Sequence, residues 1–328
     1  MQILVLLCSY NGESYLREQV ESILKQTEPG VRLLISDDAS SDRSGEIAEA
    51  YAARYPERVC LIRRAKSSGS AAKHFMEVLL KQAAELAPEA EYVMFADQDD
   101  VWHPDKAERT LFAMRKAEQH FGVQTPLLVH CDMRIVDAAG RRLADSYVKY
   151  QHMSPKRVAL HQLLVQNNVT GGAVMLNGAL IRLLRSRPVP AHPVMHDHWM
   201  ALVAAAFGRV VFLPEALYDY RQHGANVLGA SKGSCVREVL DRLGIFRRDG
   251  RSKQEMDAHS ERVYRGLFLQ AEELLKQYGE KLCPEQEELL RAFLSLPGKS
   301  RLGKIRLILR YGFTFNQIHR TVGECLFM

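Results

Sequence analysis

Three carboxylates occur within four positions of one short stretch, MFADQDDVWHPDK at residues 94–106. Asp97, Asp99 and Asp100 directly follow an apolar run, and like charges this close repel one another. A divalent cation removes that repulsion and prefers hard oxygen ligands, so the Asp-x-Asp spacing of Asp97 and Asp99 favours a metal site. Such a cation could grip a diphosphate and neutralise the charge of a departing nucleotide. An acidic turn that caps the next helix is the alternative for this motif taken alone.

Two further stretches of the sequence contain aspartates that could bind substrate or act as a base. Asp37 and Asp38 close a second apolar run, where a carboxylate can accept the imide N–H of a uracil or thymine ring. Asp197, in MHDHW, precedes an apolar helical pattern. Partial burial beside Trp199 would raise its affinity for protons, which suits a general base for an acceptor hydroxyl. A turn or helix N-cap is the structural alternative for all three aspartates.

Histidine and glycine residues add weaker signals. His223, in YRQHGAN, could supply a nitrogen ligand to the metal or contact phosphates, and is otherwise an ordinary loop histidine. His196 and His198 flank Asp197, but their spacing matches no common zinc site. Gly171 and Gly172 stand where a strand is predicted to begin, which allows either a ligand to approach the backbone or a bulge.

Residues 299–311, KSRLGKIRLILRY, carry five basic side chains and no acidic one. Leu302, Ile305, Leu309 and Phe313 are predicted to share one side of a helix. This pattern is typical of a membrane-surface anchor, and a docking helix with a solvated basic face is equally consistent with it. No nucleic-acid motif accompanies it, so a nucleic-acid partner is not expected.

The elements that position these residues follow from hydrophobic periodicity. Short apolar runs alternate with helical patterns and predict strands over residues 3–7, 31–35, 59–62, 92–96 and 127–131. This alternation predicts an α/β fold with a doubly wound, mostly parallel sheet flanked by helices. Ligands on such sheets bind beyond the carboxyl ends of the strands. Because Asn11, Asp37–Asp38 and Asp97–Asp99 all follow strands, we expect them to meet at one rim.

The second half has a less regular pattern. It predicts a strand over 170–177, a helix over 197–207 and short strands over 210–213 and 216–220. Helices are then predicted over residues 236–246, 253–278, 285–296 and 299–311. We place a boundary near residue 230, with a helical C-terminal region over 231–328.

The bulk composition is that of a globular protein. The 328 residues are 47% hydrophobic and 25% charged, with a net charge of +5. No uncharged apolar stretch reaches the roughly 18 residues of a transmembrane helix, and the apolar run at the N-terminus is too short for a signal peptide. The six cysteines form no CxxC pair, which argues against a zinc module or disulfide framework and fits a reducing cytoplasm.

Six ordered motifs resemble the family 2 glycosyltransferases of GT-A fold, in particular the rhamnosyltransferase-like branch. They are LLCSYNGESYLREQVESILKQT, LISDDASSDRSGEIAEAY, YVMFADQDDVWHPDK, TGGAVMLN, MHDHWMALVAAAFG and YRQHGANVLG. The resemblance covers roughly residues 1–230. It implies a GT-A domain with a nucleotide-sugar half over about 1–132 and an acceptor half over about 133–230. It also implies inverting chemistry that depends on Mg²⁺ or Mn²⁺.

The resemblance further implies roles for individual residues. The nucleotide sugar would be bound by Ser9, Tyr10, Asn11, Glu13, Asp37, Asp38, Asp97 and Gln98. The acceptor would be bound by Gly171, Gly172, His196 and Trp199. The metal would be bound by Asp97, Asp99 and His223, and Asp197 would be the catalytic base. His74 stands where many relatives carry Asn or Arg, which leaves a diphosphate contact at that position open.

Residue patterns and resemblance agree on one expected function. A sugar would move, with inversion, from a nucleoside-diphosphate sugar, dTDP-rhamnose or a UDP-hexose, to a hydroxyl of a glycan. The acceptor is expected to be lipid-linked, at the cytoplasmic face of a bacterial membrane, in surface polysaccharide synthesis. One alternative is a nucleotide-sugar or polysaccharide-binding protein without catalysis. Another is a sugar-nucleotide nucleotidyltransferase, which normally has a Gly-rich basic loop where CSYNGES stands here.

Overall fold

The computed structural model describes residues 2–223, 253–316 and 321, which fall into two compact units. The first unit contains residues 2–147, 169–190 and 195–223. The second contains residues 148–168, 191–194, 253–316 and 321. The helix predicted over 236–246 lies outside the described residues.

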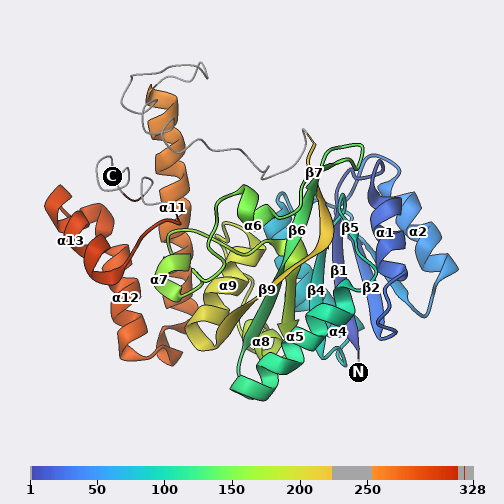
Figure 1. The fold of residues 1–328 in the computed structure, drawn as a ribbon, viewed down its shortest axis with the longest axis horizontal. Helices are drawn as coiled ribbons and strands as arrows, with labels where there is room; N and C mark the ends of the chain where they lie inside the picture. The colour runs from blue at the N-terminus through green and yellow to red at the C-terminus, as the bar shows by residue number, and fades with distance from the viewer. Residues whose placement is uncertain (1, 224–252, 317–320, 322–328) are drawn as a thin grey trace. The chain divides into compact units, whose positions relative to one another are not determined.

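The first unit is built on one mixed β-sheet (Figure 1). In the described residues its nine strands run in the order β3-β2-β1-β4-β8-β6-β9-β5, and β7 pairs with β6. The strands are β1 (Ile3–Ser9), β2 (Val31–Asp37), β3 (Val59–Arg63), β4 (Tyr92–Asp97), β5 (Val101–Trp102), β6 (Leu127–Val136), β7 (Arg142–Ala144), β8 (Val174–Asn177) and β9 (Arg209–Arg221). Strands β3, β2, β1 and β4 are parallel as predicted, and β8 runs antiparallel to both of its neighbours.

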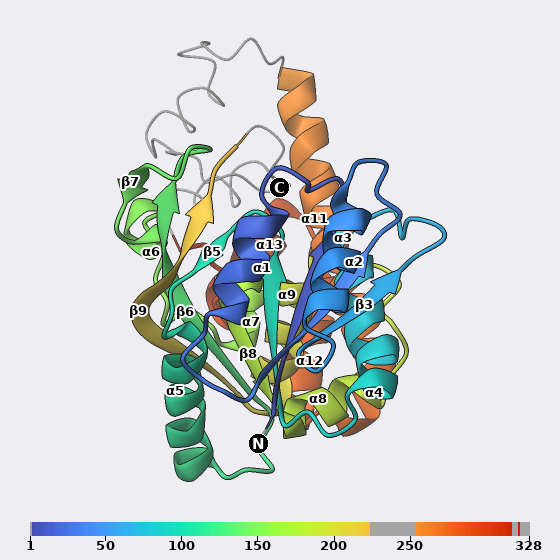
Figure 2. The same cartoon turned by 90° about the vertical axis from the view of Figure 1, so that its right-hand side faces the viewer.

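Helices cover both faces of this sheet because its strands are apolar on both sides. Helices α1 (Leu16–Leu24), α2 (Ser44–Arg54) and α5 (Lys106–Phe121) pack on one face. Helices α3 (Ala71–Glu77), α8 (Gly178–Arg185) and α9 (His196–Phe207) pack on the other, and α3 continues through η1 (Val78–Gln82) into α4 (Ala83–Leu86). Figure 2 shows β6 and β9 side by side, which agrees with their long parallel pairing.

Two predicted strands of the second half differ from the observed ones. The runs over 210–213 and 216–220 belong to one continuous strand, β9. Leu213 pairs with Cys131 and Ala216 pairs with the next residue, Asp132, so Pro214 and Glu215 are accommodated by a bulge. The strand predicted over 170–177 starts only at Val174, because Gly171–Ala173 forms a 3-10 turn, η2.

The second unit is helical. It contains α7 (Leu160–Leu163), α11 (Lys253–Tyr278), η3 (Gly279–Lys281), α12 (Pro284–Leu294), η4 (Leu296–Gly298) and α13 (Arg301–Tyr311), while the short α6 (Tyr147–Tyr150) begins at the last residue of the preceding segment. The sequence predicted that Phe313 shares one side of this helix with Leu302 and Leu309. In the structure Leu302 and Leu309 are exposed, whereas Phe313 is fully buried. Gly312 ends the helix with φ 71°, and the turned chain places Phe313 5.2 Å from the Phe293 ring. Within the described residues, no helix combines the length and apolarity needed to cross a bilayer.

Candidate active site

Strand register brings several of the predicted site residues to one rim of the sheet. Ser9 at the end of β1 pairs with Asp37 at the end of β2, and Cys8 pairs with Asp97 at the end of β4. Because β8 runs antiparallel to β4, its beginning lies at this same rim, so Gly171–Ala173 enters the sheet beside Asp97. We call this edge, where β1, β2, β4 and β9 end and β8 begins, the carboxyl rim.

Two consecutive glycines lie beside the carboxylates of Asp97 and Asp197. A Cβ atom placed on Gly172 would be 3.4 Å from Asp97 Oδ2, and one placed on Gly171 would be 3.6 Å from Asp197 Oδ2. Burial, together with the charges of Asp99 and Asp197, raises the pKa of Asp97 to about 7. Residues 97 and 197, far apart in the chain, therefore belong to one site.

The second aspartate of the Asp-x-Asp motif is paired with His223. Asp99 Oδ2 lies 2.7 Å from His223 Nε2, and the His223 ring stacks on Tyr15 with 5.0 Å between centroids. The described residues contain no group of three or more His, Cys, Asp or Glu side chains arranged to hold a metal ion. The Asp99 oxygen and the His223 nitrogen, with the carboxylate of Asp97 nearby, nevertheless fit a partly hydrated Mg²⁺ or Mn²⁺. Such an ion would relieve the repulsion between the two carboxylates.

Asp197 occupies the first turn of α9, where the helix N-terminus favours a negative charge. Its Oδ1 accepts a hydrogen bond from the backbone N–H of His198 at 2.6 Å. His196 is buried and stacks on Phe75 at 4.1 Å, and burial lowers the pKa of His196 to about 3, so its ring is neutral. Trp199 is also buried. The helix therefore places Asp197 at the rim with only 7% of its surface exposed, and it buries the rings of His196 and Trp199.

Polar side chains after β1 and β2 tie the two adjoining loops together. The carboxylate of Asp37 accepts hydrogen bonds from the hydroxyls of Ser9, at 3.2 Å, and Ser40, at 2.5 Å. Asn11, with φ 50°, accepts a hydrogen bond from the backbone N–H of Ser41 in the loop after β2. Glu13 accepts one from the backbone N–H of Arg43 in the same loop. These predicted nucleotide-binding residues shape the loops that a nucleotide would contact.

Asp38 and Gln98 are each bound to a neighbouring loop. Asp38 Oδ2 accepts hydrogen bonds from the hydroxyls of Ser67, at 2.9 Å, and Ser68, at 2.8 Å. Burial acts to raise the pKa of Asp38, but the hydrogen bonds from Ser68 and Ser67 outweigh it and lower that pKa. The Gln98 amide accepts from the Tyr10 N–H at 2.8 Å and donates to the Tyr10 carbonyl at 3.1 Å, while the Tyr10 ring stays half exposed.

Sequence reasoning missed two buried cations at this rim. Arg221 is buried, and its guanidinium donates to the carbonyl of Asp99 at 2.9 Å and to Glu18 Oε2 at 2.6 Å. Lys106 is fully buried and donates to the carbonyl of Gly172. A single basic residue in a sequence carries no mark of burial, so only the fold reveals them.

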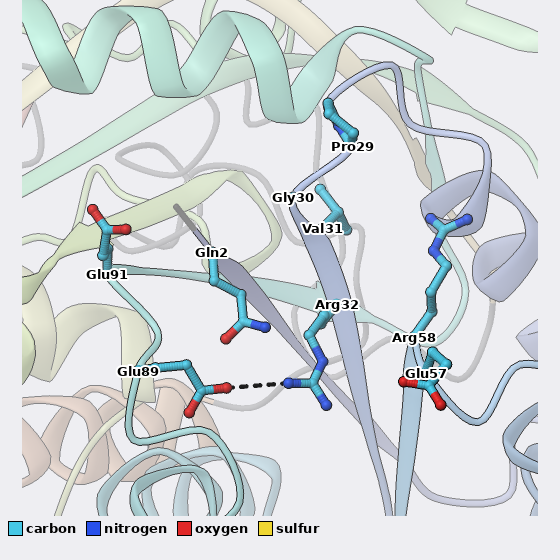
Figure 3. Close-up of a pocket in the computed structure, with 9 residues that line it drawn as sticks. All are labelled: Gln2, Pro29, Gly30, Val31, Arg32, Glu57, Arg58, Glu89 and Glu91. Carbon is cyan, nitrogen blue, oxygen red and sulfur yellow. Dashed lines mark hydrogen bonds and ion pairs between the residues drawn. The ribbon is translucent and has the colours of Figure 1, made fainter.

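A separate pocket lies at the opposite edge of the sheet, at the amino ends of β1 and β2 (Figure 3). It encloses about 470 Å³, and Arg32 and Glu89 form an ion pair of 3.1 Å in its wall. It is lined by Gln2, Pro29, Gly30, Val31, Arg32, Glu57, Arg58, Glu89 and Glu91. None of the site residues above contributes to it, so we assign the chemistry to the carboxyl rim.

The fold is that of the GT-A glycosyltransferases. The solved structure of S. aureus TarS 1–349 aligns with a TM-score of 0.54 and 18% identity, covering 94% of this chain and 72% of that one. The structure of TarS 1–349 in complex with UDP-GlcNAc aligns with a TM-score of 0.51 and 20% identity, covering 92% of this chain and 83% of that one. At these identities the likeness defines the fold alone.

Residues 4–127 match the family model of Glycosyl transferase family 2. The dTDP-rhamnosyl transferase RfbG of Shigella flexneri is 31% identical over 105 residues, which are 32% of this chain and 35% of that protein. The putative teichuronic acid biosynthesis glycosyltransferase TuaG of Bacillus subtilis is 34% identical over 114 residues, 34% of this chain and 42% of that protein. Over residues 4–127 the chain is therefore similar to the family 2 glycosyltransferases, as its motifs predicted, and the matched parts span less than half of these two relatives.

Proposed function

We propose that this protein is an inverting glycosyltransferase that moves a sugar from a nucleoside-diphosphate sugar to a hydroxyl group of a glycan acceptor. The observation that carries the proposal is the placement of Asp97 and Asp197 against two consecutive glycines at the carboxyl rim. If the donor is held on the Asp97 side and the acceptor on the Asp197 side, the acceptor hydroxyl would lie close enough to the anomeric carbon for direct attack. Such proximity supplies much of the rate in reactions between two bound substrates.

The proposed reaction is a single displacement. Asp197 takes the proton of the acceptor hydroxyl while the hydroxyl oxygen attacks the anomeric carbon. The bond between that carbon and the diphosphate oxygen breaks through an oxocarbenium-like transition state, and attack from the opposite face inverts the configuration. Asp99 and His223, with Asp97 beside them, are the residues that would hold Mg²⁺ or Mn²⁺, which would neutralise the leaving diphosphate.

The loops after β1, β2 and β4 are proposed to hold the nucleotide. The half-exposed ring of Tyr10 can stack on the base. Asp38 is buried and already bound by Ser67, Ser68 and Arg64, so it would accept the imide N–H of the base only in exchange for one of these contacts. The buried hydrogen bond between Ser9 and Asp37 and the exposed hydrogen bonds between Gln98 and Tyr10 fix these loops in advance, which lowers the entropy cost of binding.

Relatives suggest the substrates. RfbG is named as a dTDP-rhamnosyl transferase, and TarS was solved with UDP-GlcNAc, so dTDP-rhamnose and UDP-hexoses are the proposed donors. TuaG is named for teichuronic acid biosynthesis, which supports a cell-surface polysaccharide as the product. We propose a lipid-linked glycan as acceptor, used at the cytoplasmic face of the membrane.

Helix α13 is the proposed membrane-contacting surface. Leu302 and Leu309, one above the other at i and i+7, are 81% and 71% exposed and are flanked by basic side chains, whereas Ile308 anchors the helix from its buried side. The double variant Leu302→Ser/Leu309→Ser should lose cosedimentation with vesicles that contain phosphatidylglycerol. Phe112→Ser, at an exposed site on α5, is the control. If the double variant cosediments with these vesicles as strongly as wild type and Phe112→Ser do, the membrane role of α13 is refuted.

The function is tested by a screen of nucleotide sugars against alkyl glycosides, with Mn²⁺ present and with release of nucleoside diphosphate as the readout. Asp197→Asn should lower the transfer rate by about a thousandfold, which is the size of effect expected when a general base and the stabilisation from its charge are removed. The donor Kd should stay within about threefold of the wild-type value. Asp145→Asn, an exposed aspartate, is the matched control.

Three results would contradict the proposal. An Asp197→Asn variant that loses donor binding in proportion to transfer would remove Asp197 from the role of base. Binding of donors without any turnover by wild type would favour the binding-protein alternative. Pyrophosphate exchange would indicate a nucleotidyltransferase.

A further inference from the structure

Lys106, the first residue of α5, has no solvent-exposed surface. A lysine ordinarily extends its ammonium group into water, and a charged group taken out of water is destabilising unless it is paired or hydrogen-bonded. Burial lowers the pKa of Lys106 to about 8, although the nearby carboxylates of Asp100 and Asp97 act to raise it. The displacement reaction described above gives this side chain no role.

The Lys106 ammonium contacts three structural elements: the turn at Gly172, β5 and β9. Nζ donates a hydrogen bond to the carbonyl oxygen of Gly172, in the turn that leads into β8. It also lies 3.7 Å from the centroid of the Trp102 ring in β5 and 4.0 Å from that of Tyr218 in β9. Cation–π contacts of this kind offset part of the cost of burying the charge. The side chain thus joins α5, β5, β9 and the glycine turn.

The carbonyl that Lys106 holds belongs to the dipeptide between the two carboxylates of the site. Gly171 faces Asp197, and Gly172 faces Asp97. A Cβ on Gly172 would also meet Asp100 Oδ2 at 3.1 Å and Tyr218 Oη at 3.3 Å, so this turn is closely packed on its rim side. A hydrogen bond from a charged donor is stronger than one between neutral groups, so this bond can fix the position of a turn that has no side chains of its own.

We propose that Lys106 is a positioning residue that sets the separation of Asp97 and Asp197 through the Gly172 carbonyl, and that this separation favours transfer to the acceptor over attack by water. The proposal rests on the transfer reaction proposed above. In transfer, the acceptor oxygen bonds to the anomeric carbon as the bond to the diphosphate breaks, and Asp197 takes the hydroxyl proton. In hydrolysis, a water oxygen bonds to that carbon instead, and its proton passes to solvent.

The two reactions differ in how much alignment they need. A bound hydroxyl must be held at a defined place between donor and base, whereas water can reach the anomeric carbon from several positions. A turn released from Lys106 therefore lowers transfer more than hydrolysis. Loss of structure alone would lower both in the same proportion, because it removes active enzyme. The ratio of transfer to hydrolysis separates positioning from stability.

The test compares wild type with Lys106→Met, using the donor and alkyl glycoside that the screen identifies. Methionine has about the length and volume of the lysine side chain, so Lys106→Met removes the charged donor with little change in packing. Release of nucleoside diphosphate with and without acceptor gives the ratio. We expect Lys106→Met to lower it by about tenfold or more, a change of about 1.4 kcal/mol in relative barriers, with the donor Kd within about threefold. Lys116→Met, exposed on the same helix and also stacked on a ring, is the control and should match wild type.

Lys106→Arg is the second variant, since it keeps a charged donor on a side chain long enough to reach the carbonyl; its ratio should lie closer to wild type than that of Lys106→Met. A folded Lys106→Met enzyme with an unchanged ratio overturns the inference, and so does an equal loss of both reactions. If Lys106→Met does not fold, Lys106→Gln, which is neutral and too short to hold the carbonyl in place, decides by the same ratio. Wild type that shows neither transfer nor hydrolysis would refute the proposed function, whereas an unaltered ratio in the variants refutes this inference alone.

Discussion

Gly171 gives a sharp test of how the candidate base is positioned. A Cβ at this residue would lie 2.5 Å from His196 Nε2 and 2.9 Å from His196 Cε1, with Asp197 Oδ2 at 3.6 Å. Ordinary contact begins near 3.4 Å, so Gly171→Ala requires a shift of about 1 Å. The His196 ring cannot give way easily, because it is stacked on Phe75 at 4.1 Å with Phe95 at 5.7 Å.

The strain must then move the first turn of α9, which carries Asp197. Overpacking of this size costs about 1–3 kcal/mol. At about 2–4 °C per kcal/mol for a unit of this size, the melting temperature should fall by roughly 5 °C. A displacement of about 1 Å at a reacting group lowers turnover by about a hundredfold. Calorimetry and the transfer assay measure the two effects separately.

A double-mutant cycle identifies the clash as the cause. His196→Ala removes the ring that the new methyl group would meet, at the cost of a cavity. In His196→Ala, the further change Gly171→Ala should therefore cost at least about 1 kcal/mol less than it does in wild type. Gly298→Ala, where nothing lies within 4 Å of the added atom, is the control for the substitution itself. Additive effects, or a Gly171→Ala protein with wild-type melting temperature and turnover, would refute this account of the packing.

Two other predictions concern acid stability and metal. Burial lowers the pKa of His130 to about 4, so between that value and its unfolded value of about 6.5 the unfolded chain binds the extra proton, and stability falls as the pH falls. Relative to wild type, His130→Leu should gain about 2 kcal/mol between pH 7.5 and pH 5 in urea titrations; a difference independent of pH would contradict the burial of a neutral ring. Mn²⁺ at about 100 times its Kd should stabilise the native protein by about 2.7 kcal/mol, and Asp99→Asn should abolish that shift in calorimetry, while Asp145→Asn retains it. A shift that survives Asp99→Asn would place the ion elsewhere.

The parallel half of the sheet could be predicted because its strands are buried on both faces. The apolar runs over residues 3–7 and 92–96 can be recognised without knowledge of their partners, and the residues that follow each run lie at the carboxyl rim. The convergence of Asp37 and Asp97 follows from that rule. Strand β8 lies within the strand predicted over residues 170–177, but its antiparallel insertion between β4 and β6 was not predicted, since four residues between a glycine turn and a helix cap carry too little pattern to give a direction.

Local pattern failed where a backbone conformation or a distant contact decides the structure. A helical wheel places Phe313 with Leu302 and Leu309, but the left-handed Gly312 ends the helix before it. The sequence shows Lys106 as one of many charged residues, and only its contacts with Trp102 and Tyr218, which lie on different strands, make it a buried one.

The same limit explains why Asp197 could be predicted as a candidate base but could not be placed relative to Asp97. Asp197 follows from its position ahead of an apolar helix, yet its distance from Asp97 depends on the turn at Gly171–Gly172, which has no side chains to mark its path. Burial, followed by the charges of Asp99 and Asp197, raises the pKa of Asp97. A fold gains nothing in stability from that arrangement. The proposed transfer reaction does gain from it, because Asp197 would take the proton of the acceptor hydroxyl while Asp97 would lie beside the cation that neutralises the diphosphate, and only two glycines separate these two positions.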